Sequence, residues 1–248
     1  MCRHLAYLGP PRRIGELLAD PPYGLVRQSW APRRQRHGTV NADGFGVGWY
    51  VEGLPEPARH RGAGPVWADE TFADLTRVVT TGCLLAAVRS ATPGMPPGAA
   101  ATAPFRRGRR LFSHNGRLEG WPKAAEPLAA RLPPGPLLGL DALSDSGLLW
   151  ALVDDLLDRG RDPGAALADV VRLAREVTGG RFNFLLTDGA TVAATAAGDS
   201  LYWRVLPGEE QGGVVVASEP YDDQAGWFEV PDDHLVVAAA GGVSVIPL

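Results

Sequence analysis

The chain has 248 residues, 45% of them hydrophobic and 21% charged, which is enough apolar content for one large core or two small ones. Its 24 Lys and Arg against 28 Asp and Glu give a formal net charge of −4, which points to neither nucleic acid nor an anionic membrane as a partner. Two cysteines, Cys2 and Cys83, are too few for a disulfide framework and lack zinc-site spacing, so we expect no metal and no cofactor.

The hydropathy pattern predicts a soluble, cytoplasmic protein. No apolar run reaches the roughly 18 residues of a membrane-spanning helix. No hydrophobic segment precedes Cys2, which argues against a signal peptide. Because no repeat or long linker divides the chain, the sequence predicts one domain over residues 1–248 and leaves the oligomeric state open.

The first half of the chain is predicted to consist mainly of strands. Strand-like runs, most of them apolar and bounded by glycine or proline, predict strands at residues 2–9, 43–53, 83–91 and 109–116. Glycine alternates with large residues in the second run, as in a strand that another backbone approaches closely. Helices are predicted at 14–20 and at 71–82, the latter ending at Gly82.

Two long helices are predicted next in the chain, followed by strands. The first, 144–160, can be capped by Ser144 or Asp145, and the second, 164–180, stops at a Gly-Gly pair. The remaining segments read as strands and turns, with a hairpin at TDGA, at residues 181–205, 213–220 and 234–248. Two sheets with helices between them in the chain predict an α+β layered domain.

The opening residues MCRHLAYLG place a cysteine directly after the initiator methionine. One interpretation is chance, because most N-termini are frayed and uninformative. The other is that Met1 is removed, as is normal before a residue as small as cysteine, so that Cys2 becomes the first residue. A thiol and a free α-amine would then share one residue, and a terminal amine can act as base for its own nucleophile.

Two further stretches have both a structural and a functional interpretation, and a third has a structural one. In AAVRSATPG, Arg89 ends an apolar strand, where it is either solvated or paired with an anion. In SHNGRLEGW, Asn115 and Gly116 form either a hairpin turn or an oxyanion hole from the side-chain amide and the backbone N–H. In LSDSG, a helix N-cap explains Asp145. The stretch NADGFGVGWY lacks the order of glycines and lysine of a phosphate loop.

Taken in order, Cys2, NADGFGVGWY, VRSAT, SHNG and SDSG resemble the glutaminase domain of the class II glutamine amidotransferases, which are N-terminal-nucleophile hydrolases. VVASEPYDDQAGWFEVPDDHLVVA is similar to the closing sheet of the stand-alone members, so the resemblance covers essentially the whole chain. It implies a four-layer αββα sandwich, with two antiparallel sheets face to face and helices outside.

The resemblance also implies the catalytic groups. Cys2 would be the nucleophile and its α-amine the general base, usually working through a water. Asn115 and Gly116 would form the oxyanion hole for the tetrahedral intermediate. The physical chemistry agrees, because a terminal amine has an unperturbed pKa of about 7.7–8.0 and therefore accepts and returns a proton near neutrality.

The same resemblance implies how a glutamyl group is held. Arg89, with Thr92 beside it, would bind the α-carboxylate, and Asp145 would bind the α-ammonium. A free amino-acid head group carries two opposite charges, so its recognition needs a bidentate cation and an anion fixed a few ångströms apart.

The full pattern is most similar to one stand-alone group, the γ-glutamyl-hercynylcysteine sulfoxide hydrolases of ergothioneine biosynthesis. This resemblance implies that a Cys2 thioester forms, that water is the acceptor, and that glutamate and hercynylcysteine sulfoxide are released. Two alternatives stay open: a glutaminase subunit that passes ammonia to a partner, and a non-catalytic γ-glutamyl-binding protein. In each case the ligand is a small γ-glutamyl molecule.

The leaving part of that conjugate would carry a trimethylammonium group and a carboxylate. Trp30 and the basic residues Arg33, Arg34 and Arg36 follow the QS dipeptide in a predicted loop. One hypothesis is that the Trp30 ring binds the quaternary ammonium through its face and that Arg33 pairs with the carboxylate. The alternative is a solvated basic loop.

Overall fold

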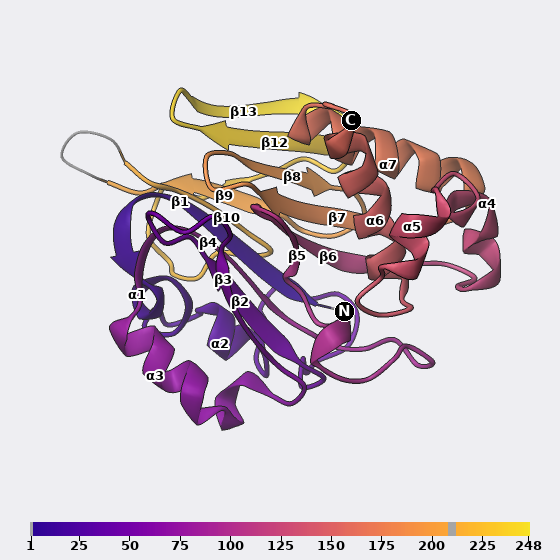
Figure 1. Ribbon diagram of the computed structural model, residues 1–248. Coiled ribbons are helices and arrows are strands. Elements are labelled where there is room, and N and C mark those ends of the chain that lie inside the picture. The colour runs from indigo at the N-terminus through magenta and orange to yellow at the C-terminus, as the bar shows by residue number, and fades with distance from the viewer. Residues whose placement is uncertain (1, 208–211) are drawn as a thin grey trace.

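The computed structural model describes residues 2–207 and 212–248, and its strands form two antiparallel sheets (Figure 1). The 7-stranded first sheet runs, edge to edge, through β11 (Phe228–Glu229), β9 (Tyr202–Val205), β10 (Val214–Ala217), β1 (Arg3–Arg13), β4 (Thr80–Val88), β2 (Phe45–Trp49) and β3 (Ala58–Gly62). The 6-stranded second sheet runs through β13 (Gly242–Pro247), β12 (His234–Ala239), β8 (Val192–Ala196), β7 (Gly180–Thr187), β6 (Arg110–Leu118) and β5 (Phe105–Arg107).

Helices lie on the outer side of both sheets (Figure 1). The first sheet carries α1 (Ile14–Leu18), α2 (Leu25–Gln28) and α3 (Glu70–Val78), and the second carries α6 (Asp145–Asp158) and α7 (Pro163–Val177). Two short helices, α4 (Glu126–Ala129) and α5 (Pro134–Leu138), stand at the α6–α7 side. Within the described ranges, no helix is long and apolar enough to span a membrane.

Strand alternation divides the apolar side chains among three cores. Along β1, Leu5 and Tyr7 pack toward α1–α3, whereas Ala6 packs between the sheets. Along β7, Phe182 and Phe184 pack toward α6 and α7, whereas Leu185 faces the first sheet. Successive residues of a strand point to opposite faces, so each central strand contributes to two cores. The predicted four-layer αββα sandwich is therefore confirmed.

The predicted helix over 71–82 is wrong at its C-terminal end. Helix α3 stops at Val78, and Thr80 and Thr81 already belong to β4, where they pair with Arg13 and Arg12. The segment carries four β-branched residues in succession, which lose side-chain freedom in a helix and pack well in a strand. Long-range pairing with β1 therefore ends the helix early.

The glycine-rich strand is explained by close packing, as predicted. A Cβ at Gly46 of β2 would lie 2.4 Å from the carbonyl oxygen of Ala103, in the segment that leads into β5. That distance is too short for any side-chain carbon, so only glycine allows the two backbones to approach. The contact ties the first sheet to the edge of the second.

Candidate active site

Strand register brings the first residues of the chain to Arg89. In the first sheet, Arg3 of β1 lies opposite Val88 of β4, so Cys2 and Arg89 are neighbours at the same end of the two strands. The second sheet supplies Asn115 from β6, and the Cys2 backbone N–H donates to its Oδ1 at 3.1 Å across a separation of 113 residues. The structure thus joins three of the predicted site residues.

A cavity of about 30 Å³ lies beside the nucleophile candidate. Its lining includes Cys2 and Arg89, together with Ser113 and His114 of β6 and Ser146 of α6. A water molecule needs about 10–15 Å³ of such space, so the cavity is large enough for one.

Asn115, the residue after His114 in β6, has an unused hydrogen-bond donor. Its Oδ1 accepts from Cys2, while its Nδ2 is buried and has no hydrogen-bond partner within residues 2–207 and 212–248. Buried donors nearly always have a hydrogen-bond partner in folded proteins, so a buried donor without one indicates a specific role such as binding or catalysis. An oxygen of a bound molecule is one partner that would satisfy it.

Asn115 and Gly116 do not form a hairpin turn. They continue β6 and lie opposite Asn183 and Phe182 of β7. A Cβ at Gly116 would lie 1.9 Å from the carbonyl oxygen of Arg181, so glycine is required here by the neighbouring backbone. The hairpin interpretation is wrong because pairing with β7 extends the strand through the Asn-Gly pair.

Arg89 is buried and already oriented by the protein. Only 8% of its surface is exposed, and its Nη1 and Nη2 donate to the carbonyl oxygens of Asp43 and Pro96 at 3.2 and 3.0 Å. The interpretation as a solvated strand-end charge is therefore wrong. Thr92 lies in the loop after β4, where its carbonyl oxygen accepts from Met95, and in the described structure it does not line the cavity.

Asp145 is the first residue of α6, and the cap is Ser144, whose hydroxyl accepts from Gly147. The Asp145 carboxylate instead accepts from the backbone N–H groups of Leu118 and Ser146 at 3.0 and 2.6 Å. It is buried and favoured there by the helix dipole, which stabilises negative charge at a helix start. The N-cap interpretation of Asp145 is therefore wrong.

His114 is a residue of the cavity that the sequence interpretation missed. Its ring nitrogens lie 3.0 Å from the Ser146 hydroxyl and 2.9 Å from the carbonyl oxygen of Arg181. Burial lowers the pKa of His114, so the ring is neutral, donates to the carbonyl and accepts from the hydroxyl. In the sequence, only its position directly before Asn115 could have pointed to His114, because its two hydrogen-bond partners, Ser146 and Arg181, come from distant segments.

Cys83, the second thiol, is in a different environment from Cys2. It is buried, and its Sγ lies 3.3 Å from the Thr187 hydroxyl between the two sheets. Burial raises the pKa of the Cys83 thiol to about 12, which keeps it protonated at neutral pH. These surroundings are those of an inert core residue rather than of a reactive thiol.

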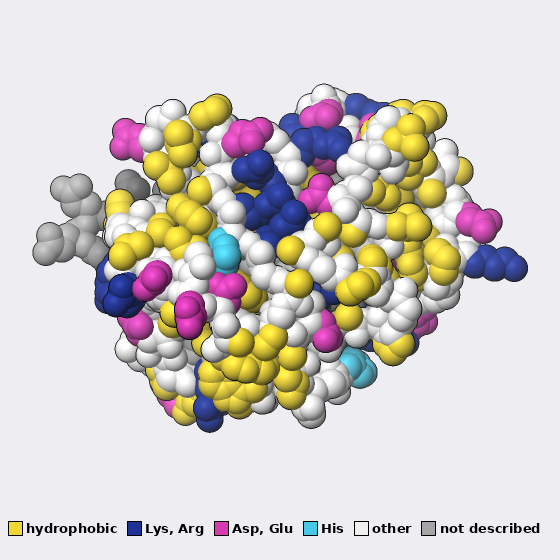
Figure 2. Space-filling model, turned by 60° about the horizontal axis from the view of Figure 1, so that its bottom comes forward, with side chains coloured by type: hydrophobic (Ala, Val, Ile, Leu, Met, Phe, Trp, Pro, Cys, Tyr) yellow, Lys and Arg dark blue, Asp and Glu magenta, His cyan; other side chains and the backbone are white. Residues whose placement is uncertain are grey.

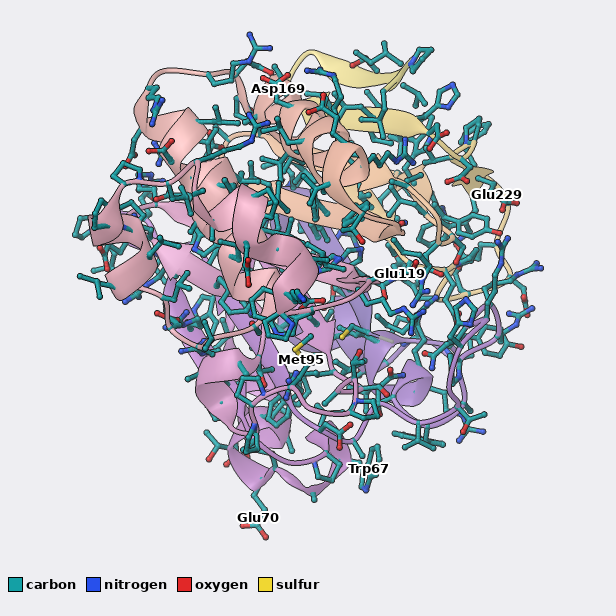
Figure 3. The ribbon with its side chains drawn as sticks, turned by 90° about the vertical axis from the view of Figure 1, so that its right-hand side faces the viewer. Trp67, Glu70, Met95, Glu119, Asp169 and Glu229 are labelled. Carbon is teal, nitrogen blue, oxygen red and sulfur yellow. The ribbon has the colours of Figure 1, made fainter. Side chains whose placement is uncertain are left out.

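Trp30 lies on the surface in an aromatic pair. Its ring is edge-to-face with Trp67 at 5.6 Å, and the Arg27 guanidinium lies 5.3 Å from its centre. Trp30 and Trp67 are 38% and 47% exposed, and Trp67 stands at the lower edge of the molecule in Figure 3. Met95 is labelled nearer the centre of the same view. An exposed pair of indole rings is thus available to a ligand.

Arg33 contacts different residues from those that surround Trp30. Its guanidinium lies 3.9 Å above the Tyr23 ring and pairs with Asp223 at 2.8 Å. Figure 2 shows Lys and Arg side chains gathered near the centre of one face, with acidic side chains beside them. The Arg33 guanidinium is therefore already stacked on an aromatic ring and paired with a carboxylate.

No cluster of three or more His, Cys, Asp or Glu side chains suited to a metal ion is found in the described part of the chain.

Comparison with known proteins places this site in context. The chain is 42% identical to the γ-glutamyl-hercynylcysteine sulfoxide hydrolase of Mycolicibacterium smegmatis, over 100% of both chains. It is 26% identical to a probable glutamine amidotransferase of Saccharomyces cerevisiae, over 100% of this chain and 84% of the yeast protein.

Solved structures share the fold. A glutamine aminotransferase class-II domain protein of Silicibacter pomeroyi superposes with a TM-score of 0.70 at 22% identity, covering 100% of this chain and 99% of the other. Glutamine phosphoribosylpyrophosphate amidotransferase of Bacillus subtilis gives a TM-score of 0.68 at 19% identity, covering 99% of this chain and 49% of that one. Residues 24–210 match the family described as glutamine amidotransferases class-II. The chain therefore belongs to the class II glutamine amidotransferases.

Proposed function

We propose that this protein hydrolyses the γ-glutamyl amide bond of γ-glutamyl-hercynylcysteine sulfoxide and releases glutamate and hercynylcysteine sulfoxide. The observation that carries the proposal is the full-length identity of 42% to a hydrolase named for that substrate. The hydrogen bond between Cys2 and Asn115 supports the chemistry, because it brings a nucleophile candidate to a free amide donor. We further propose a single cytoplasmic domain over residues 1–248 that acts on a small molecule.

The first half-reaction begins once Met1 has been removed. The Cys2 sulfur attacks the γ-carbonyl carbon, and its proton passes to the α-amine of the same residue, directly or through a water in the adjacent cavity. The tetrahedral intermediate then expels the leaving amine, which takes that proton as the C–N bond breaks. The product of this half-reaction is a γ-glutamyl thioester on Cys2.

Water completes the reaction by attacking the thioester carbonyl. The α-amine accepts a proton from this water and returns it to the sulfur as the carbon–sulfur bond breaks, so that the thiol and the free amine are regenerated as glutamate leaves. In both half-reactions negative charge develops on the carbonyl oxygen. Asn115 Nδ2 and the Gly116 backbone N–H would stabilise that charge, since preorganised donors favour the transition state over the ground state.

The glutamyl head group would be held by Arg89, Thr92 and Asp145. The two carbonyl partners of Arg89 fix the plane of its guanidinium, so the fork is oriented before a carboxylate arrives. Asp145 is fixed in the same way by two backbone N–H groups. Both charges are therefore preorganised, which reduces the ordering cost of binding.

Replacing Arg89 by lysine is expected to raise KM for a γ-glutamyl substrate by about 10- to 100-fold, because an ammonium cannot reproduce the bidentate fork. Steady-state kinetics of Arg89→Lys checks this. Arg131→Lys, which changes an exposed arginine paired with Glu176 at 3.8 Å, is the matched control. An unchanged KM for Arg89→Lys would exclude Arg89 as the carboxylate ligand.

The leaving group would contact Trp30 through its trimethylammonium and Arg33 through its carboxylate. Trp30→Ala and Arg33→Ala are each expected to lower kcat/KM for the conjugate about tenfold and to leave kcat/KM for glutamine unchanged, because glutamine lacks that part. Phe228→Ala, which removes an exposed ring stacked on Trp203, is the aromatic control. Equal losses on the conjugate and on glutamine would refute the assignment.

A second function is a glutaminase that passes ammonia to a partner, which the amidotransferase family membership favours. The purified protein assayed against a panel of γ-glutamyl compounds separates the two. The proposed hydrolase turns over the conjugate far faster than glutamine and releases no ammonia from it. Faster turnover of glutamine with ammonia release, stimulated by a partner, would instead establish the amidotransferase subunit.

A further inference from the structure

Arg3, the residue after the nucleophile candidate, is fully buried. Its Nε donates to the carbonyl oxygen of Cys2 at 2.9 Å. Its Nη1 and Nη2 have no hydrogen-bond partner in the part of the chain that the structure describes. A buried cation needs a compensating charge, and for Arg3 this is the carboxylate of Glu219, whose Oε2 lies 3.9 Å from Nη1.

Glu219 is fully buried as well, and it binds a second segment of the chain. Its Oε1 and Oε2 accept from the backbone N–H groups of Arg33 and Arg34, each at 2.8 Å. One carboxylate thus connects the start of β1 to the loop that follows α2. Charge-assisted bonds of this kind are about twice as strong as neutral ones.

Ser218, the residue before Glu219, is hydrogen-bonded to the backbone of β1. The His4 backbone N–H donates to the Ser218 hydroxyl at 3.0 Å, and the Ser218 N–H donates to the His4 carbonyl oxygen at 2.9 Å. Glu219 therefore cannot shift relative to β1 without breaking these bonds.

The terminal residue of the mature chain would depend on Arg3 for its orientation. Terminal residues fray unless other groups tie them down. Two hydrogen bonds hold the Cys2 backbone: its N–H donates to Asn115, and its carbonyl oxygen accepts from Arg3. A free amine can keep an N–H on Asn115 while its lone pair accepts the thiol proton, and the bond from Arg3 holds the other end of the same residue.

We propose that Arg3 and Glu219 form a positioning pair that orients Cys2 and fixes the loop at residues 33–34 relative to it. This role rests on the proposed function, since it supposes that Cys2 is the nucleophile. Neither side chain lines the cavity beside Cys2. The pair acts by holding the thiol and the amine in line with the glutamyl carbonyl, where a displacement of about 1 Å can cost 10²-fold in rate.

A glutamine analogue with a diazo-ketone in place of the side-chain amide, 6-diazo-5-oxo-L-norleucine, tests the pair by labelling Cys2. Glu219→Gln and Arg3→Lys are each expected to lower the maximal labelling rate, kinact, about 10²-fold while leaving the inhibition constant, KI, unchanged. The reason is that the glutamyl head group still binds, while Cys2 is less well oriented. Intact-mass spectrometry over time measures both constants.

Arg3→Lys keeps the charge that Glu219 needs but removes the Nε donor, so it tests the hydrogen bond to Cys2 even if Glu219→Gln fails to fold. The matched control is Asp154→Asn, which changes another fully buried carboxylate, paired with Arg110 at 2.8 Å and Arg107 at 2.9 Å. It is expected to lower thermal stability and to leave kinact as in the wild type. A merely structural role for Glu219 would give the same result as this control.

A double variant, Arg3→Lys with Glu219→Gln, checks that the two act as one unit. Its kinact should be no lower than that of the worse single variant, because coupled residues are not additive. Wild-type kinact in folded Arg3→Lys would overturn the proposal, as would multiplied losses in the double variant. Labelling does not involve the leaving group, so a wild-type protein that is labelled but leaves the conjugate intact would refute only the proposed substrate.

Discussion

Replacing Cys2 by alanine is expected to lower kcat for γ-glutamyl hydrolysis by about 10⁶-fold, the scale of loss when a hydrolase loses its nucleophile. No other described thiol can substitute, since Cys83 is buried between the sheets with its pKa raised to about 12. Release of glutamate from the conjugate, followed by chromatography, measures the effect. KM and the fold should be retained, because alanine fills most of the same space.

Cys83→Ala is the matched control for this variant. It removes the other thiol and its contact with the Thr187 hydroxyl, but it lies away from the cavity beside Cys2. It should therefore keep wild-type kcat. Comparable losses in both variants would mean that neither thiol is the specific nucleophile.

The same mechanism requires a free α-amine. A variant with leucine inserted between Met1 and Cys2 keeps the thiol, but the cysteine can no longer become the N-terminal residue of the mature chain. Its activity should fall to the level of Cys2→Ala, because an amide nitrogen cannot accept the thiol proton. Intact-mass spectrometry must show Met1 removed in active wild-type protein and retained in this variant. Full activity with Met1 retained would end the proposed mechanism.

Replacing Asn115 by aspartate is expected to lower kcat by about 10²–10³-fold or more, the cost of removing one oxyanion donor. The aspartate retains an oxygen for the Cys2 N–H and so preserves the one bond that the side chain makes. It replaces the free Nδ2 donor by an acceptor that repels the developing oxyanion. KM should change little, since Asn115 acts mainly on the transition state.

Asn115→Ala removes the acceptor as well as the donor, and comparison of the two variants separates these roles. If Nδ2 stabilises the oxyanion, both variants lose kcat while their melting temperatures stay near that of the wild type. Wild-type kcat in Asn115→Asp would refute the oxyanion role, and loss confined to Asn115→Ala would assign Asn115 to holding Cys2 alone.

Much of the secondary structure follows from local pattern. The alternation around Leu5, Ala6 and Tyr7 marks β1 as a strand buried on both faces, and the hairpin at TDGA does join β7 to β8. The apolar periodicity of α6 and α7 locates both helices to within a few residues. These features depend on neighbours in the chain, so a single sequence contains the information.

Features that depend on distant partners were decided only by the tertiary structure. Local propensity at Asn115-Gly116 favours a turn, yet pairing with Phe182 and its neighbours makes the pair part of a strand. The contact of Cys2 with Asn115 and the burial of Arg3 against Glu219 join residues 113 or more positions apart. No short window of sequence contains such a contact, because its free energy arises only when distant strands pair and pack so that water is excluded.

The order of motifs in the sequence therefore determined the family and the identity of the candidate groups, whereas their mutual orientation was decided by strand register and sheet packing. Residue types and local spacing express which chemistry a chain can perform. Distances and burial are properties of long-range pairing, and they decide which of those groups meet.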